Sequence, residues 1–170
     1  KIYIDNIIFK WQRSGGISVV WYELIKRILK EKQQEFQYYY IEYFGTDRNL
    51  FHKSLAIPAS NILLSKANNL FKLKRYFSET IKKERDRFIF HSTYYRICTN
   101  NKAINIITVH DFTYEIYNTG ITKWIHCITK HKSLRKADYI ICISENTKKD
   151  LLQFVNGIDK KKVRVIYNGA

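Results

Sequence analysis

Residues 104–109 form a short, mostly apolar run that constrains the fold of the whole chain. A strand buried on both faces reads this way, and such strands occur in parallel sheets flanked by helices. The run ends at His110 and Asp111. Ligands bind outside the carboxyl ends of strands in open parallel sheets, so this imidazole and this carboxylate are candidates for chemistry or substrate contact. The structural alternative is that Asp111 caps the next helix and that His110 is a hydrogen-bonded packing residue.

Predicted strands and helices alternate along the chain, whose 170 residues suffice for one domain with a substantial core. Short apolar runs predict strands at residues 2–9, 36–44, 88–90, 104–109, 139–143 and 163–166. Helical spacing of apolar residues predicts helices after the loop 10–16, over 68–85, over 121–136 and after residue 144. Ser14 and Ser144 are the expected N-caps, and residues 46–66 are expected to form a loop with at most one short helix. The alternation indicates an α/β fold, namely a Rossmann-like, doubly wound, mostly parallel sheet.

Gly15 and Gly16 lie between the first predicted strand and the first predicted helix. Glycine lets the backbone approach a bound group, and the free amides of a first helical turn favour an anion. A tight turn that needs glycine for its dihedral angles would use the same residues. The segment is neither a GxGxxG fingerprint nor a P-loop, because no GK[ST] follows.

The chain is strongly basic, with 30 Lys and Arg against 15 Asp and Glu and a net charge of +15. This excess predicts an anionic partner, which could be nucleic acid, membrane lipid or a phosphorylated substrate. Residues 66–87 carry many of these charges on a predicted helix. They form either a basic amphipathic surface for anionic lipid or an ordinary solvated face.

Cys98, Cys127 and Cys142 are widely spaced and odd in number, so we expect reduced, buried thiols without a disulfide framework or a metal site. No apolar run reaches the length of a membrane span. Residues 1–9 do not resemble a secretory signal, because Asp5 and Asn6 interrupt the apolar stretch. We therefore expect a cytoplasmic protein.

Five segments, in this order, resemble a known family: SGGI after the first strand, FHSTYY, NIITVHDFTYE, ADYIICISENTKKDL and KVRVIYNGA. Together they resemble the N-terminal domain of glycosyltransferase family 4, the retaining enzymes of the GT-B fold. The likeness is greatest to bacterial mannosyltransferase-like members that build surface polysaccharides. The resemblance implies a single Rossmann-like acceptor-side domain over residues 1–170, with the nucleotide-sugar-binding domain absent from this chain.

The resemblance also implies roles for particular residues. His110 would lie beside the transferred sugar as the catalytic residue, and Gly15 and Gly16 would approach the donor diphosphate. Asn168 and Gly169 would open the crossing to the second domain. The implied cleft or acceptor-binding residues are His91, Tyr94, Tyr95, Asp111, Ser144 and Glu145.

The implied activity is transfer of a hexose from a nucleotide-sugar to a glycan or lipid-linked acceptor, without a metal or cofactor. The protein would work in the cytoplasm, attached peripherally to the anionic inner face of the cell membrane, and the 170-residue chain alone would be inactive. Two alternatives stay open: a basic nucleic-acid-binding domain and a non-catalytic, Rossmann-like interaction domain. No recognised nucleic-acid motif occurs, so nucleic acid is not the expected partner.

Overall fold

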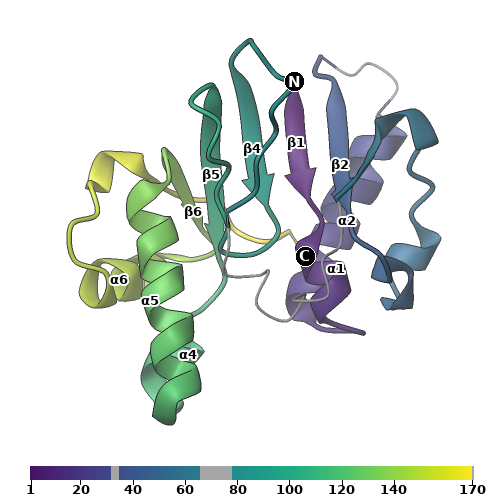
Figure 1. The fold of residues 1–170 in the computed structure, drawn as a ribbon. Helices are drawn as coiled ribbons and strands as arrows, with labels where there is room; N and C mark the ends of the chain where they lie inside the picture. Colours follow the sequence, from purple (N-terminus) through teal and green to yellow (C-terminus); the bar gives the residue numbers. More distant parts are fainter. Residues whose placement is uncertain (32–34, 66–77, 170) are drawn as a thin grey trace.

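The computed structural model describes residues 1–31, 35–65 and 78–169, and its arrangement is shown in Figure 1. Within these residues, seven strands form one sheet in the order β3-β2-β1-β4-β5-β6-β7, and every pairing is parallel. The strands are β1 (Ile2–Asp5), β2 (Tyr38–Glu42), β3 (Ile62–Leu64), β4 (Phe88–Ser92), β5 (Ala103–Val109), β6 (Tyr139–Cys142) and β7 (Val163–Val165). The predicted Rossmann-like, doubly wound sheet is confirmed.

The helices pack on both faces of this sheet. They are α1 (Ile7–Trp11), α2 (Gly16–Lys30), α4 (Thr113–Tyr117), α5 (Gly120–Lys136) and α6 (Glu145–Phe154). The connection from β1 to β2 runs toward one end of the strand order, and the connection from β5 to β6 runs toward the other end. Because both crossovers are right-handed, their helices α2 and α5 lie on opposite faces of the sheet. The strand order therefore reverses between β1 and β4, and the strand arrows in Figure 1 all point to the edge where α1 and α4 lie.

Separate apolar clusters fill the space between sheet and helices. Ile107 and Ile140 pack with Leu134 and Leu151 under α5 and α6. On the other face the core beneath α2 is formed by Ile4, Ile8, Phe9, Trp21, Ile25 and Tyr40. A third cluster, which includes Tyr3 and Phe90, covers β1, β2 and β4 on the face away from α2. Burial on both faces explains why the strands read as apolar runs.

The first predicted strand, residues 2–9, is wrong in its second half. β1 ends at Asp5, and Ile7, Ile8 and Phe9 are buried residues of α1. An apolar run of this length is ambiguous, because a short buried helix has the same composition as a strand. Ser14 is not the cap of the next helix: α2 has Gly15 as its N-cap residue, with no side-chain hydrogen bond.

Residues 46–66 contain a strand that the sequence did not predict, β3, together with three 3₁₀ turns at Thr46–Arg48, His52–Ser54 and Ala59–Asn61. β3 has three residues and is half-buried at most, which leaves little apolar periodicity. The predicted helix over 68–85 lies largely outside the described residues. Its described end, residues 78–85, is not helical and includes a bridge between Glu79 and Cys98.

The remaining elements agree with the sequence apart from their ends. The strand predicted at 36–44 is shorter, and the one predicted at 88–90 extends to Ser92, so His91 lies inside β4. The helix over 121–136 is confirmed as α5. Cys98 and Cys142 are buried thiols as expected, whereas Cys127 is partly exposed.

Candidate functional site

A crevice of about 320 Å³ opens at the carboxyl edge of the sheet, where the strand order reverses between β1 and β4. Its walls come from α1, the start of α2, the loops after β4 and β5, and the helices α4 and α5. The lining residues are Ile8, Trp11, Gln12, Ile17, Tyr94, Tyr95, Asp111, Thr113, Tyr114 and His126. Ligands of open α/β sheets bind at such a reversal point, so the crevice is the candidate site.

Aromatic rings form much of the crevice wall. The rings of Tyr114 and His126 lie 4.1 Å apart between centroids, and those of Tyr94 and Tyr95 lie 5.0 Å apart. Tyr95 also meets His126 edge-on at 5.9 Å. Such side chains offer flat apolar faces with polar tips, which suits a ligand that has both apolar and hydroxyl-bearing surfaces.

Two groups of the crevice, the side-chain amide of Gln12 and the carboxylate of Asp111, present oxygen acceptors beside its hydroxyl, indole and imidazole groups. Oε1 of Gln12 is buried and has no hydrogen-bond partner within the described residues. Gly15 makes room for this amide, because a Cβ there would lie 2.7 Å from Gln12 Oε1. Asp111 is exposed, and its Oδ1 accepts from the backbone amide of Thr113 at 3.0 Å. A ligand rich in donors, such as one with several hydroxyls, would satisfy these oxygens.

A buried lysine holds the loop between β5 and α4 in place. Lys130 Nζ donates to the backbone oxygen of Asp111 at 2.8 Å and lies 3.1 Å from Glu115 Oε1. The ammonium also lies 3.8 Å from the ring centre of Phe112, close enough for a cation–π contact. Burial lowers the pKa of Lys130, although Glu115 acts against this shift. The sequence showed only a basic helix and gave no sign that one of its lysines points inward.

Glu115 completes this anchor from α4. Burial alone would raise the pKa of its carboxyl, but the hydrogen bond from His131 and the charge of Lys130 outweigh burial and lower the pKa to about 2. The distance between His131 Nε2 and Glu115 Oε1 is 3.1 Å. In the unfolded chain the carboxyl would titrate at its ordinary value of 4.5. Folding therefore stabilises the ionised form of the Glu115 carboxyl.

Replacing Glu115 by glutamine should lower the free energy of unfolding at pH 7 by on the order of 2 kcal/mol. Because the folded pKa is depressed, this contribution is present above pH 4.5 and is lost as the pH falls toward 2. Urea titrations at pH 7, 4.5 and 2.5 should show wild type and variant converging at low pH. Glu23→Gln, a change at a carboxylate that is 43% exposed, should follow the wild-type curve. A constant difference at all three pH values would contradict the role of the charge.

His110 follows directly after β5, as predicted. Its Nε2 is buried and has no hydrogen-bond partner within the described residues. Burial lowers the pKa of the imidazole to about 4, although the charge of Asp111 opposes this, so the ring is neutral at pH 7. The ring of His110 is thus not fully hydrogen-bonded among the described residues, and its role stays a prediction. The structural alternative is supported for Asp111, which accepts from the first residue of α4, although the N-cap residue itself is Phe112.

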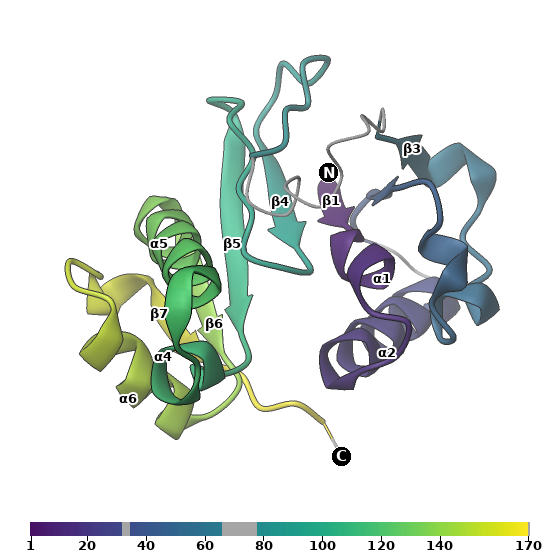
Figure 2. The same cartoon turned by 60° about the horizontal axis from the view of Figure 1, so that its bottom comes forward.

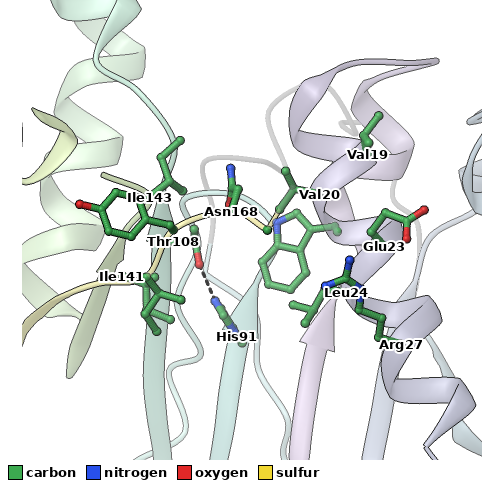
Figure 3. Close-up of a pocket in the computed structure, with 14 residues that line it drawn as sticks. Val19, Val20, Glu23, Leu24, Arg27, His91, Thr108, Ile141, Ile143 and Asn168 are labelled. Atoms are coloured by element: carbon green, nitrogen blue, oxygen red, sulfur yellow. Dashed lines mark hydrogen bonds between the residues drawn. The ribbon is translucent and has the colours of Figure 1, made fainter. Parts of the chain in front are cut away.

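The structure divides the predicted cleft residues between two cavities. Tyr94, Tyr95 and Asp111 line the crevice, whereas His91 lies on the face of the sheet that α2 covers. There a groove of about 590 Å³ runs between α2 and β6 (Figure 3). His91 was expected beside the two tyrosines, but alternate residues of a strand point to opposite faces. The position of His91 inside β4 thus separates it from them.

The groove is mainly apolar. Val20 and Leu24 of α2 face Ile141 of β6 across the groove. Two of its polar side chains bond to each other, since His91 Nε2 lies 2.9 Å from Thr108 Oγ1. Burial, together with the smaller effect of the nearby His110, lowers the pKa of His91 to about 4. Figure 2 shows the C-terminal segment running from β7 along this side, and Asn168 and Gly169 line the groove beside α2.

The predicted helix N-termini differ in how they are capped. At α2, no side-chain hydrogen bond caps the first turn, and a Cβ on Gly16 would meet no atom within 4 Å, so there is free space beside this residue. At α6, Ser144 is the cap that the sequence predicted, and its Oγ accepts from Thr147 N at 3.1 Å. Glu145 is 67% exposed in its side chain and pairs with Lys148 at 3.8 Å. Ser144 and Glu145 line neither the crevice nor the groove, and their place in a cleft stays a prediction.

No group of His, Cys, Asp and Glu side chains suited to holding a metal ion occurs among the described residues. Likewise, none of the helices in the described part of the chain is both long enough and apolar enough to cross a membrane.

Comparison with known proteins identifies the family. Residues 14–170 match the family model described as Glycosyltransferase Family 4. A comparison with curated proteins gives no significant match. The family match extends from the loop before α2 through every later element of the sheet, and it agrees with the Rossmann-like architecture. The chain therefore belongs to glycosyltransferase family 4.

Proposed function

We propose that this chain is the acceptor-binding, N-terminal half of a retaining GT-B glycosyltransferase. In this proposal the enzyme transfers a hexose from a nucleotide-sugar to a glycan or lipid-linked acceptor in surface polysaccharide synthesis. The observation that carries the proposal is the crevice at the reversal point of the sheet, with its aromatic walls and the buried, unpaired Oε1 of Gln12. Family membership supports a glycosyltransferase-type domain.

The crevice suits the sugar of an acceptor. A pyranose has apolar C–H faces, which the rings of Tyr114 and Tyr95 can cover, and hydroxyls at its rim. Those hydroxyls can donate to Gln12 Oε1, which is buried without a partner among the described residues, and to the exposed carboxylate of Asp111. The same carboxylate disfavours an anionic group, so we assign the donor phosphates elsewhere.

The uncapped start of α2 is the proposed place for those phosphates. Its amides and the positive end of the helix dipole favour an anion, and Gly16 leaves space for a close approach. A second, nucleotide-binding domain would hold the rest of the donor. The departing diphosphate would then be stabilised by preorganised amides and basic groups, with no metal required in the proposal.

The proposal is tested by assaying the full protein with a panel of nucleotide-sugars and of glycan and lipid-linked acceptors. Tyr114→Ala should raise KM for the acceptor roughly tenfold, the equivalent of about 1.4 kcal/mol, and should leave KM for the donor unchanged. The control is Phe44→Ala, which removes a ring that is 78% exposed and lies outside the crevice. Both kinetic constants should stay at the wild-type value in that variant.

Two results would count against the proposal. One is a Tyr114→Ala enzyme with an unchanged acceptor KM, because the crevice would then not hold the acceptor. The other is the absence of transfer from every nucleotide-sugar together with tight, salt-sensitive binding of nucleic acid, which would favour the basic nucleic-acid-binding alternative.

A further inference from the structure

Helix α5 turns its polar side to the protein and its apolar side to solvent. His126 is 4% exposed and Lys130 is 2% exposed, and with Leu134 they form the inner face. On the outer face, Ile121 is 80% exposed and Trp124 is 68% exposed. This reverses the usual pattern of a surface helix, in which the apolar stripe faces the core. The apolar spacing that predicted this helix came mainly from Trp124, Ile125 and Ile128, and all three side chains are exposed in the structure.

The exposed side chains form one continuous surface. Positions 121, 124, 125 and 128 follow helical spacing and so share one face of α5. The neighbouring helix α4 adds Ile116 and Tyr117, which are also exposed. We call the following set the α4–α5 apolar surface: Ile116, Tyr117, Ile121, Trp124, Ile125 and Ile128. Exposed apolar patches of this kind mark contact sites.

Basic residues continue the same face of α5. Lys132 and Arg135 lie one to two turns after Ile128 and are exposed, as is Lys136. No acidic residue occurs between positions 118 and 137. The outer face therefore has an apolar half followed by a cationic half.

We propose that the α4–α5 apolar surface inserts into the interface of an anionic lipid bilayer. Helices that lie in the interface bury their apolar face by roughly 5–10 Å, a depth that the exposed side chains from Ile121 to Ile128 would occupy. Lys132 and Arg135 then lie at the level of the headgroups, where anionic lipid attracts them. Trp124 belongs to the residue type that is enriched at this boundary.

A second copy of the chain fits this surface less well. In a twofold dimer each surface meets its own equivalent, so the cationic halves would lie close to one another without an acidic residue between them. Interface cores are also depleted in lysine. An anionic bilayer complements both halves at once, because it offers an apolar layer next to a negatively charged one.

The surface is continuous with the crevice. Tyr114 of α4 and His126 of α5 line the crevice from the same two helices whose other sides are apolar and exposed. Figure 1 shows α5 running along the sheet, with its lower end and α4 beyond the carboxyl edge. Insertion would bring the crevice next to the lipid headgroups. The membrane contact does not depend on sugar transfer and is measured without substrate.

Vesicle sedimentation tests the proposal, with vesicles of phosphatidylcholine and phosphatidylglycerol in equal parts and with phosphatidylcholine alone. The protein should bind the mixed vesicles, and added salt should weaken binding. The double variant Ile121→Ser/Trp124→Ser should lose roughly tenfold or more in affinity. The matched control Phe44→Ser/Leu64→Ser changes two side chains that are 78% and 79% exposed elsewhere, and it should bind like wild type. Equal losses in both double variants would overturn the proposal.

The cationic half is tested separately. Lys132→Gln/Arg135→Gln should weaken binding to the mixed vesicles roughly tenfold, whereas Lys160→Gln/Lys161→Gln, at exposed positions outside α5, should have an effect of about twofold or less. Brominated lipids should quench tryptophan fluorescence in the wild type, and Trp124→Phe should abolish most of this quenching, because Trp21 is buried and Trp11 is only partly exposed, whereas Trp124 is 68% exposed. Equal affinity for neutral vesicles would overturn the proposal. So would a dimer that Ile121→Ser/Trp124→Ser dissociates in a protein that binds no vesicles.

Discussion

Replacing Arg96 by methionine should lower the free energy of unfolding by about 3–5 kcal/mol, because it leaves a buried carboxylate without its partner. Arg96 and Asp5 are 1% and 0% exposed, and Arg96 Nη1 lies 3.0 Å from Asp5 Oδ2. The guanidinium also donates to Glu79 at 2.9 Å and to the hydroxyl of Tyr43 at 2.6 Å. It thus ties the ends of β1 and β2 to the loop after β4.

The size of this effect follows from the cost of burying charge. Burial raises the pKa of Asp5, even though Arg96, Tyr43 and Ser92 act to lower it. Burial likewise works against the charge of Arg96, but the carboxylates of Asp5 and Glu79 hold its pKa above the ordinary value. The intact pair therefore gains little over apolar residues of the same size. Removing one member of the pair strongly lowers the free energy of unfolding, because the other charge stays buried without a partner.

Urea denaturation of wild type, Arg96→Met, Asp5→Asn and the double variant measures the coupling. The double variant should lose less than the sum of the single losses, because both charges leave together. Arg164→Met is the control, since Arg164 is exposed and bonds only to nearby backbone oxygens in the described structure. Its free energy of unfolding should change by about 0.5 kcal/mol or less. Strict additivity of the two single losses would show that the side chains do not act as a pair.

The sequence predicted the sheet because its signal is local. The apolar run at residues 104–109 and the alternation of strands with helices both survive in the structure, as does the serine cap of α6. The first strand was overextended because Ile7, Ile8 and Phe9 are buried in a helix that begins immediately after it. β3 was missed because it is a short edge strand. Composition alone does not distinguish a short buried helix from a strand, or a short edge strand from a loop.

The candidate site was predicted only in part, since it depends on which face each side chain occupies. The carboxyl edge of β5 could be located, and with it Asp111, which lines the crevice; His110 follows β5 as predicted but lines neither cavity. The sequence gave no sign that Gln12, Tyr114 and His126 join Asp111, because these residues come from three elements that meet only in the fold. The inward direction of Lys130 was equally invisible, since a lysine on a basic helix is normally solvated.

His110→Ala should lower turnover of the full enzyme by roughly two orders of magnitude, the usual scale for one positioned polar group. This expectation rests on the proposed transfer reaction. The neutral ring lies at the end of β5 with its buried Nε2 unused, so it can hydrogen-bond a sugar hydroxyl or lie beside developing positive charge. Both interactions matter more in the transition state than in the ground state. Since the pKa is about 4, this residue should add no inflection to the rate between pH 5.5 and 8.

The melting temperature of His110→Ala should stay close to that of wild type, because the change removes an unsatisfied buried nitrogen while it leaves a small cavity. The matched comparison is His91→Ala, which removes a second imidazole whose pKa is about 4 but whose Nε2 is bonded to Thr108 in the groove. That variant should lose more stability and less activity, because its partner would be left unpaired and the crevice would be intact. Turnover and melting temperature of both variants separate the two roles. An active His110→Ala enzyme that melts at a much lower temperature would make the histidine a packing residue.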